Sequence, residues 1–191
     1  MKRVFSTSYH GSGFKDLFTA LVKLYSPQTI VELGTQHGRS AIWLAKAMKQ
    51  GHLYTYDLFQ KRYAYPPHGL TRASLTATKR NIAAANLQDK ITIRRKEALL
   101  AYKDFDQVDI LHCDFGNFYD TVLLILKQWH NKVNKLIILE GGIYNKWQRE
   151  FNFRPFAKVL DMKFISKDYD HVTINKNAHY AVTLLVRKEK K

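Results

Sequence analysis

Short apolar runs alternate with amphipathic stretches along most of the chain. Five apolar runs have the length and composition of buried strands, at residues 29–31, 53–56, 91–94, 108–113 and 135–139. Apolar positions recur at helical spacing at residues 14–25, 41–48, 71–86 and 119–129, and residues 99–105 predict a short helix or turn. This alternation predicts an α/β fold with a doubly wound, mostly parallel sheet and helices on both faces.

The pattern is weaker in the last part of the chain. Residues 146–160 predict a partly helical segment that is interrupted near Pro155. Residues 163–168 and 180–186 predict two final strands, joined through residues 170–177. Because no crossover helix separates these two strands, we expect them to add an antiparallel edge to the sheet.

The clearest local signal is the segment from Thr29 to Ser40. Gly34 and Gly38 follow the first predicted strand, and a helix opens at about Arg39. Glycines in such a turn let the backbone approach a ligand closely, and the start of a helix offers unpaired N–H groups. The segment therefore predicts a nucleotide-sized site. Its G-x-x-x-G spacing does not match the dinucleotide fingerprint, and the sequence contains no phosphate-binding P-loop motif.

Acidic residues recur at the ends of the predicted strands. They are Glu32, Asp57, Glu97, Asp114 and Glu140. Ligands of open α/β sheets bind outside the carboxyl ends of the strands, so these acids are expected to converge on one crevice. Asp57 follows the glycine turn by about 20 residues, where an acid can accept both ribose hydroxyls of a nucleoside. Each acid taken alone has a second interpretation, as a helix cap or a surface residue.

Length and composition indicate one domain. The chain has 191 residues, of which 46% are hydrophobic and 25% are charged. We expect residues 14–191 to form this domain and residues 1–13, which are rich in Ser and Gly, to form a loop or lid. The sequence shows neither a membrane-length apolar run nor a secretory leader, and the single Cys113 excludes an internal disulfide. A cytoplasmic location without membrane contact is the resulting expectation.

The formal net charge of +15 widens the list of partners. A basic protein can bind nucleic acid, but scattered basic residues are also typical of a solvated surface. The densest basic clusters here are residues 94–96 and 187–191. Nucleic acid is therefore an open but not favoured partner, and a small molecule is preferred. The N-terminal helix provides a surface through which two copies could form a homodimer.

Five segments resemble the motifs of class I S-adenosylmethionine-dependent methyltransferases. Residues 31–40 (Val-Glu-Leu-Gly-Thr-Gln-His-Gly-Arg-Ser) resemble the first motif, and residues 54–57 resemble the second, ribose-binding motif. Residues 96–98 lie where the family has an acid-containing motif beside adenine. Residues 111–119 and 137–142 resemble the motifs of the fourth and fifth strands. The pattern is most similar to the small-molecule O-methyltransferase branch, which includes catechol-type and macrocin-type enzymes.

This resemblance implies a Rossmann-like seven-stranded fold and S-adenosylmethionine as the cofactor. It implies that Glu32 and the backbone near Gly34 hold the methionine part, and that Asp57 takes the ribose hydroxyls. The implied cofactor-binding residues are Glu32, Gly34, Thr35, Gly38, Ser40, Asp57, Leu58, Glu97, Ala98 and Asp114. Glu97 and Ala98 would flank adenine. Ser40 would bond the cofactor carboxylate or, equally, serve as an ordinary residue of the first helical turn.

The resemblance leaves a divalent metal open. Metal-dependent members of the family use a carboxylate after the fourth strand and an Asp-Asn or Asp-Asp pair after the fifth. This chain has Asp114 at the first place, and Glu140 followed by Gly141 at the second. Two carboxylates with waters can hold Mg²⁺, and Asn117 could add a third oxygen. Asp114 and Glu140 are therefore the expected metal ligands, if a metal is used.

Methyl transfer requires an acceptor aligned with the sulfonium methyl and a group that removes a proton. We expect Asp114, His37 and His10 to have catalytic roles, with His68 and His112 as further candidate bases. The aromatic residues expected to line the acceptor pocket are Tyr63, Tyr65, Phe115, Phe118 and Tyr119.

Three functions stay open at this point. O-methylation of a small-molecule hydroxyl leads, and an RNA-directed methyltransferase is the alternative that the net charge favours. The Asn/Asp-Pro-Pro-aromatic motif of amino-methylating DNA enzymes does not follow the fourth strand, where residues 114–117 read Asp-Phe-Gly-Asn. A non-catalytic S-adenosylmethionine-binding protein is the third possibility, because Gly141 departs from the metal-binding pattern.

Overall fold

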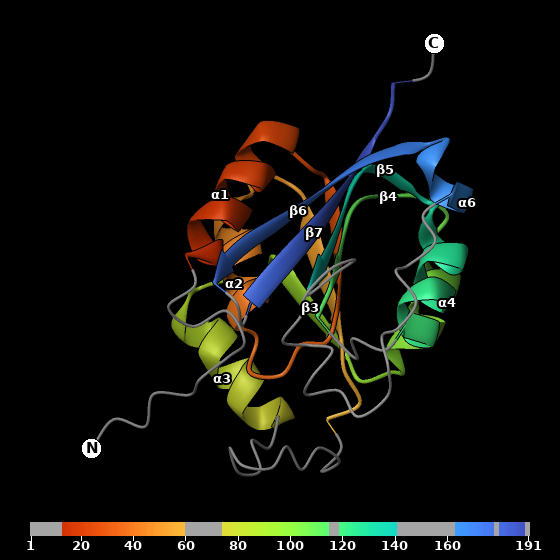
Figure 1. Cartoon of the computed structure of the whole chain (residues 1–191). Coiled ribbons are helices and arrows are strands. Elements are labelled where there is room, and N and C mark those ends of the chain that lie inside the picture. The colour runs from red at the N-terminus through yellow and green to blue at the C-terminus, as the bar shows by residue number, and fades with distance from the viewer. Residues whose placement is uncertain (1–12, 60–73, 115–118, 141–162, 178–179, 190–191) are drawn as a thin grey trace.

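Seven strands form a single sheet with helices on both faces (Figure 1). The computed structural model describes residues 13–59, 74–114, 119–140, 163–177 and 180–189. The strands are β1 (Thr29–Leu33), β2 (His52–Tyr56), β3 (Ile91–Arg94), β4 (Val108–Cys113), β5 (Val133–Glu140), β6 (Tyr169–Asn177) and β7 (Tyr180–Arg187). Their order in the sheet is β3-β2-β1-β4-β5-β7-β6.

The first five strands are parallel, and β7 runs antiparallel to both β5 and β6. The chain order reverses between β1 and β4, which makes their carboxyl ends the switch point where ligands of such sheets bind. The doubly wound, seven-stranded α/β fold that the sequence predicts is confirmed.

The helices pack on the sheet through two separate apolar cores. The helical segments are α1 (Phe14–Tyr25), α2 (Arg39–Ala47), α3 (Leu75–Ala84), the 3₁₀-helix η1 (Ala98–Asp104), α4 (Tyr119–Trp129) and α6 (Lys163–Ser166). Alternate strand residues point to opposite faces. Ile30 and Ile110 therefore share one core with α1, α2 and α3, whereas Val31 and Leu111 share the other with η1, α4 and α6. Figure 1 shows α1, α2 and α3 on one side of the sheet and α4 on the other.

The first five predicted strands and the four main predicted helices are present, with ends that differ by a few residues. The third helix begins at Leu75, later than predicted, because the Ser74 hydroxyl caps it by accepting a hydrogen bond from the Ala77 amide at 3.4 Å. The predictions for residues 1–12 and 146–160 lie outside the described part of the chain.

The prediction for the last two strands was partly wrong. Residues 163–166 form the short helix α6, and the segment predicted as a connection, residues 170–177, belongs to strand β6. Strand β6 lies at the edge of the sheet, where Asp170, His171 and Val172 are exposed. An edge strand needs few apolar residues, so its polar composition resembled that of a loop.

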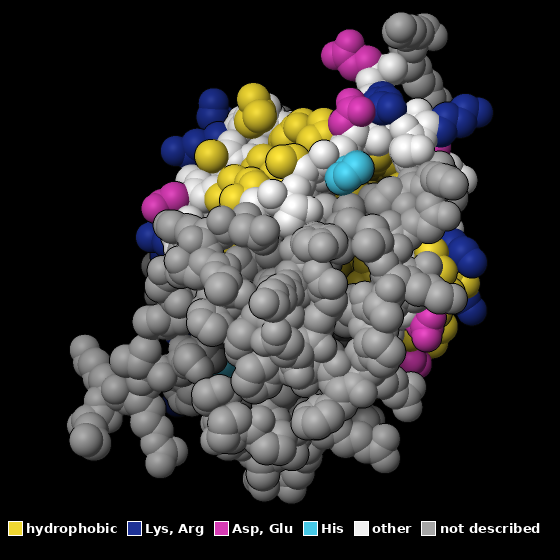
Figure 2. All heavy atoms as spheres, in the orientation of Figure 1, with side chains coloured by type: hydrophobic (Ala, Val, Ile, Leu, Met, Phe, Trp, Pro, Cys, Tyr) yellow, Lys and Arg dark blue, Asp and Glu magenta, His cyan; other side chains and the backbone are white. Residues whose placement is uncertain are grey.

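An apolar surface gathers over α1 and the neighbouring part of β6 (Figure 2). The side chains of Leu24 on α1 and Val172 on β6 are 75% and 49% exposed. This is the surface through which a homodimer would pair by its N-terminal helix, and that pairing stays a prediction. No helix in the part of the chain that the structure describes is long and apolar enough to cross a membrane.

The Tyr169 hydroxyl connects the start of β6 to the turn that follows α4. Its single proton is shared between the carbonyl oxygens of His130 and Val133, at 2.6 and 2.9 Å, and its oxygen accepts from Arg187 Nη1 at 3.1 Å. We expect Tyr169→Phe to lower the free energy of unfolding by about 1–2 kcal/mol, because a buried hydrogen-bonding centre is lost. Urea unfolding measures the loss, and an unchanged free energy of unfolding would contradict it.

Candidate functional site

The turn between β1 and α2, residues 34–38, lies at the carboxyl end of the sheet. The Gly34 amide donates to the Tyr56 carbonyl oxygen at 2.9 Å, which ties the start of the turn to β2. The Gly38 amide donates to the Thr35 carbonyl oxygen at 2.7 Å, which closes the turn. Gly38 has a φ of 75°, and a Cβ there would lie 3.1 Å from Thr78 Cγ2. A glycine at position 38 therefore meets both the backbone and the packing requirements.

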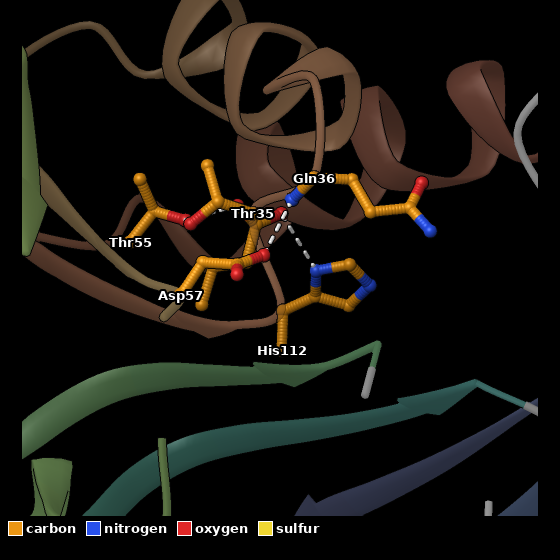
Figure 3. Close-up of polar contacts among 6 residues, drawn as sticks. Thr35, Gln36, Thr55, Asp57 and His112 are labelled. Carbon is orange, nitrogen blue, oxygen red and sulfur yellow. Dashed lines mark hydrogen bonds and ion pairs between the residues drawn. The ribbon is translucent and has the colours of Figure 1, made fainter. Parts of the chain in front are cut away.

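Asp57 stands beside this turn and is held by two backbone amides, of which Figure 3 shows that of Gln36. Its Oδ2 accepts from the Gln36 amide at 2.9 Å, and its Oδ1 accepts from the Phe59 amide at 2.7 Å. Each carboxylate oxygen can accept more than one hydrogen bond, so both keep capacity for a ligand hydroxyl. Leu58, the next residue, is exposed.

Helix α3 supports the turn from outside. The Thr78 hydroxyl donates to the Gln36 carbonyl oxygen at 2.6 Å, and Asn81 Nδ2 donates to the His37 carbonyl oxygen at 3.0 Å. Both bonds join segments more than 40 positions apart in the sequence. Sequence analysis missed Thr78 and Asn81, because on an Ala-rich helix nothing distinguishes them from ordinary surface residues.

Glu32 lies inside strand β1 and is fully buried. Its Oε2 accepts from the Thr55 hydroxyl at 2.5 Å, and its Oε1 lies 3.1 Å from His112 Nδ1. Figure 3 shows the Thr35 and Thr55 side chains meeting beside the turn, and their hydroxyl oxygens are 2.6 Å apart. His112 is also buried, with its ring 5.1 Å from that of Phe18 in α1. This enclosure makes His112 a poor candidate for a base that must meet a substrate.

Asp114 and Glu140 come together at the ends of β4 and β5. The register pairs Cys113 with Leu139, so the next residue of each strand lies side by side. Burial, followed by the charge of Glu140 and a hydrogen bond with it, raises the pKa of Asp114 well above its ordinary value, and Glu32 adds to the effect. Two such carboxylates can share a proton or a cation. Among the described residues no group of three His, Cys, Asp or Glu side chains could hold a metal.

His37 lies in the glycine turn and is only partly exposed. Burial, followed by the positive charge of Arg39, lowers the pKa of His37 below its ordinary value, while Asp57 opposes the shift. The neutral imidazole is therefore favoured near pH 7, which is the form that a general base requires. Ser40 follows in the first turn of α2 and is buried.

The segment after β3 forms one border of the site. Glu97 is exposed and precedes η1, whereas Ala98 is its buried first residue. Asp104, at the end of η1, accepts from the Tyr56 hydroxyl at 2.9 Å and from Lys96 Nζ at 2.6 Å. These bonds fix η1 against β2, immediately before Asp57 in the sequence.

Asp104→Asn is expected to lower the free energy of unfolding by about 1 kcal/mol at pH 6, because solvent screens a pair that is about one third exposed. The hydrogen bond from Lys96 is the main cause that lowers the pKa of Asp104 below its ordinary 3.8, with Tyr56 adding to it and burial opposing it. A carboxyl group whose pKa is lowered by folding stabilises the folded protein at pH values above its unfolded-state pKa. This stabilisation disappears as the pH falls through the folded-state pKa.

Urea unfolding of both proteins between pH 6 and about pH 3 measures this pH dependence. The difference between the wild type and Asp104→Asn should shrink toward acid. Asp106→Asn, in the exposed loop that follows, is the control. A difference that grew toward acid would contradict the assignment.

The structure brings the described part of the predicted site to one edge of the sheet. The turn, Asp57, Leu58, Ala98, Asp114 and Glu140 all follow or end strands β1 to β5, and their roles toward a cofactor stay predictions. Other predicted residues lie outside the described part of the chain: His10, Tyr63, Tyr65, His68, Phe115, Asn117 and Phe118. Tyr119 begins α4, but its side chain is also outside that part.

Comparison with known proteins places this arrangement in a family. Residues 31–139 match the model of the family described as methyltransferase domain. No curated protein matches the chain in sequence. The matched segment begins within β1 and ends one residue before Glu140, so it contains the turn 34–38, Asp57, Ala98 and Asp114.

Several solved structures share the fold at low sequence identity. The O-methyltransferase from Bacillus cereus in complex with SAH has a TM-score of 0.66 and 17% identity, over 98% of this chain and 84% of that chain. TomG, an O-methyltransferase from Streptomyces achromogenes in complex with SAM, has a TM-score of 0.67 and 17% identity, over 99% of this chain and 84% of that chain. A methyltransferase from Geobacter sulfurreducens has a TM-score of 0.63 and 19% identity, over 92% of this chain and 78% of that chain.

The chain belongs to the methyltransferase domain family. Its seven-stranded sheet has the Rossmann-like fold of these neighbours, and the predicted class, an S-adenosylmethionine-dependent methyltransferase, is confirmed.

Proposed function

We propose that the protein binds S-adenosylmethionine at the turn 34–38 and transfers the methyl group to a hydroxyl oxygen of a small molecule. The observation that carries the proposal is the pairing of the turn with Asp57, whose carboxylate is oriented by the Gln36 and Phe59 amides. In this pose the two carboxylate oxygens can accept the two ribose hydroxyls of the cofactor. SAH and SAM are bound by neighbours with the same fold.

Transfer to oxygen is supported by the neighbours and by the available base. Two of the neighbours are O-methyltransferases, one of them involved in tomaymycin synthesis. His37 lies in the turn itself, and the lowered pKa of its imidazole favours the neutral form that can accept the hydroxyl proton. A methyl transfer then needs only an acceptor held in line with the sulfonium methyl.

Asp114 and Glu140 are proposed to hold Mg²⁺. Both supply hard carboxylate oxygens, and they lie close enough that Glu140 helps to raise the pKa of Asp114. A divalent cation would relieve the repulsion between the two carboxylates, so the donor set fits, although the described residues bring no third His, Cys, Asp or Glu side chain to the pair. When bound, Mg²⁺ would lower the pKa of an acceptor hydroxyl.

The cofactor part of the proposal is tested by calorimetry. Wild-type protein is titrated with S-adenosylhomocysteine and with S-adenosylmethionine, and stoichiometric binding in the micromolar range is expected. Incubation with methyl-labelled S-adenosylmethionine and a panel of catechols and other hydroxylated small molecules then tests the acceptor class. Absence of cofactor binding would contradict the function, whereas labelling of RNA alone would contradict the small-molecule acceptor.

The metal part gives a separate prediction. Chelation of divalent ions is expected to lower methyl transfer at least tenfold, and Mg²⁺ to restore it. Asp114→Asn combined with Glu140→Gln should remove both the Mg²⁺ dependence and the rise in melting temperature that Mg²⁺ causes in the wild type. Asp106→Asn, at an exposed acid outside both the pair and the proposed cofactor site, is the control. Full activity after chelation would contradict the metal.

A further inference from the structure

A buried polar chain lies beneath the turn 34–38 and joins it to three strands (Figure 3). Its members are Thr35 in the turn, Thr55 in β2, Glu32 in β1 and His112 in β4. Glu32, Thr55 and His112 are fully buried, and Thr35 is 2% exposed. Burial of an acid and an imidazole costs free energy unless both are hydrogen-bonded. Conformations that break a bond of this chain are therefore disfavoured, so each bond restricts the conformation of its partners.

The protons of the chain can be assigned. The Thr55 hydroxyl has one proton and donates it to Glu32 Oε2. The 2.6 Å contact between the two threonine hydroxyls therefore has Thr35 as the donor and Thr55 as the acceptor. His112 Nδ1 lies 3.1 Å from Glu32 Oε1, and the tautomer with its proton on Nδ1 is the one that donates to a carboxylate there.

With these donors and acceptors, the hydrogen bonds connect the strands to the turn 34–38. The Thr35 hydroxyl points down to Thr55, while the carbonyl oxygen of the same residue accepts the Gly38 amide that closes the turn. The position of Thr55 thus determines the orientation of Thr35, and Glu32 and His112 determine that of Thr55. His112 also packs against Phe18, so the docking of α1 on the sheet reaches the same chain.

We propose that Thr55 and His112 are positioning residues for cofactor binding. They hold Glu32 from both sides and so fix Thr35 and the turn 34–38, without contact between their own side chains and the cofactor. The inference rests on the proposed function, because the turn it concerns is the proposed cofactor site. It assigns the affinity of that site in part to two residues buried below it.

The test compares variants that remove a bond with variants that keep it. Thr55→Val and His112→Leu are close in volume to the wild-type residues but cannot donate to Glu32. Each is expected to weaken the binding of S-adenosylhomocysteine about tenfold, measured by calorimetry at a temperature well below every melting point. Thr55→Ser keeps the hydroxyl, and His112→Asn places an N–H near the position of Nδ1, so both should stay within about threefold of the wild type.

Thr183→Val is the matched control for a general loss of stability. Thr183 is a fully buried strand threonine whose hydroxyl lies 2.9 Å from that of Thr173, on strands at the other side of the sheet. It should lower the melting temperature about as much as Thr55→Val but leave the affinity for S-adenosylhomocysteine unchanged. Should Thr55→Val not fold, His112→Leu, which removes the contact on the other side of Glu32, takes its place and is expected to show the tenfold loss.

The outcomes separate the two proposals. Wild-type binding together with equal binding by Thr55→Val or, if that variant does not fold, by His112→Leu overturns the positioning role and leaves the proposed function intact. An equal loss of affinity in Thr183→Val also overturns it, because the effect is then one of stability alone. No binding by the wild type overturns the proposed function and the inference with it.

Discussion

Asp57→Ala is expected to abolish measurable binding of S-adenosylhomocysteine, with a loss of affinity of at least about 100-fold. A hydrogen bond to a charged group contributes about 1.5–3 kcal/mol, and Asp57 would accept two from the ribose, so the loss sums to about 3–6 kcal/mol. The carboxylate also orients the Gln36 amide of the turn. Removal of Asp57 thus takes away both the ribose acceptors and a support of the site.

Calorimetric titration with S-adenosylhomocysteine measures this loss. Asp89→Ala is the control, because Asp89 is an exposed acid that precedes β3. It therefore lies at the amino ends of the parallel strands, opposite to the carboxyl ends that carry the site. Asp57→Asn keeps one acceptor oxygen and should have intermediate affinity. An affinity of Asp57→Ala within threefold of the wild type would contradict the ribose role of Asp57 and, with it, the placement of the cofactor.

The sequence predicted the parallel strands and the turn because these depend on local patterns. Buried parallel strands are continuous apolar runs, and β1 and β4 are almost fully buried as such runs require. Gly34 and Gly38 marked the turn because both have a positive φ that few other residues adopt. The convergence of Asp57, Asp114 and Glu140 on one edge followed from the rule for open sheets alone.

The side-chain contacts beneath the site could not be predicted in the same way. The bond from Thr55 to Glu32 depends on the register of β1 on β2, and that of His112 to Glu32 depends on the register of β1 on β4, which pairs these two residues directly. Strand register is a property of the assembled sheet and leaves no local sequence signal. His112 therefore entered the sequence analysis as a candidate base, although the structure buries it.

Edge strands escape sequence analysis for a related reason. Strand β6 is paired on one side only, with β7. Its first residue, Tyr169, is buried, and the three that follow are all exposed. Its polar composition reflects the solvent on its free side and was interpreted as a connection. The helix α6 that precedes it spans only Lys163–Ser166, which is too short to show helical spacing.

Gly51→Ala is expected to be the most destabilising single substitution outside the site, with a loss of at least about 3 kcal/mol in the free energy of unfolding. Gly51 precedes β2 with a φ of 95°. A Cβ at this position would lie 2.3 Å from the Gln28 carbonyl oxygen and 2.8 Å from the Gln28 Cα. That oxygen also accepts the His52 amide at 2.8 Å, so it cannot move away without breaking the first contact between the entries to β1 and β2.

Urea unfolding and the melting temperature measure this effect, with Gly38→Ala as the comparison. Gly38 also has a positive φ, but its Cβ would meet the Thr78 methyl group at 3.1 Å, and a side chain can shift where a backbone carbonyl cannot. Gly38→Ala should therefore cost about 1–2 kcal/mol, mostly from the left-handed backbone. The two variants separate backbone strain from steric exclusion. Both place alanine at a positive φ, but only Gly51→Ala also places its Cβ against a backbone carbonyl group. Equal losses would contradict the clash with Gln28 and leave strain as the common cause.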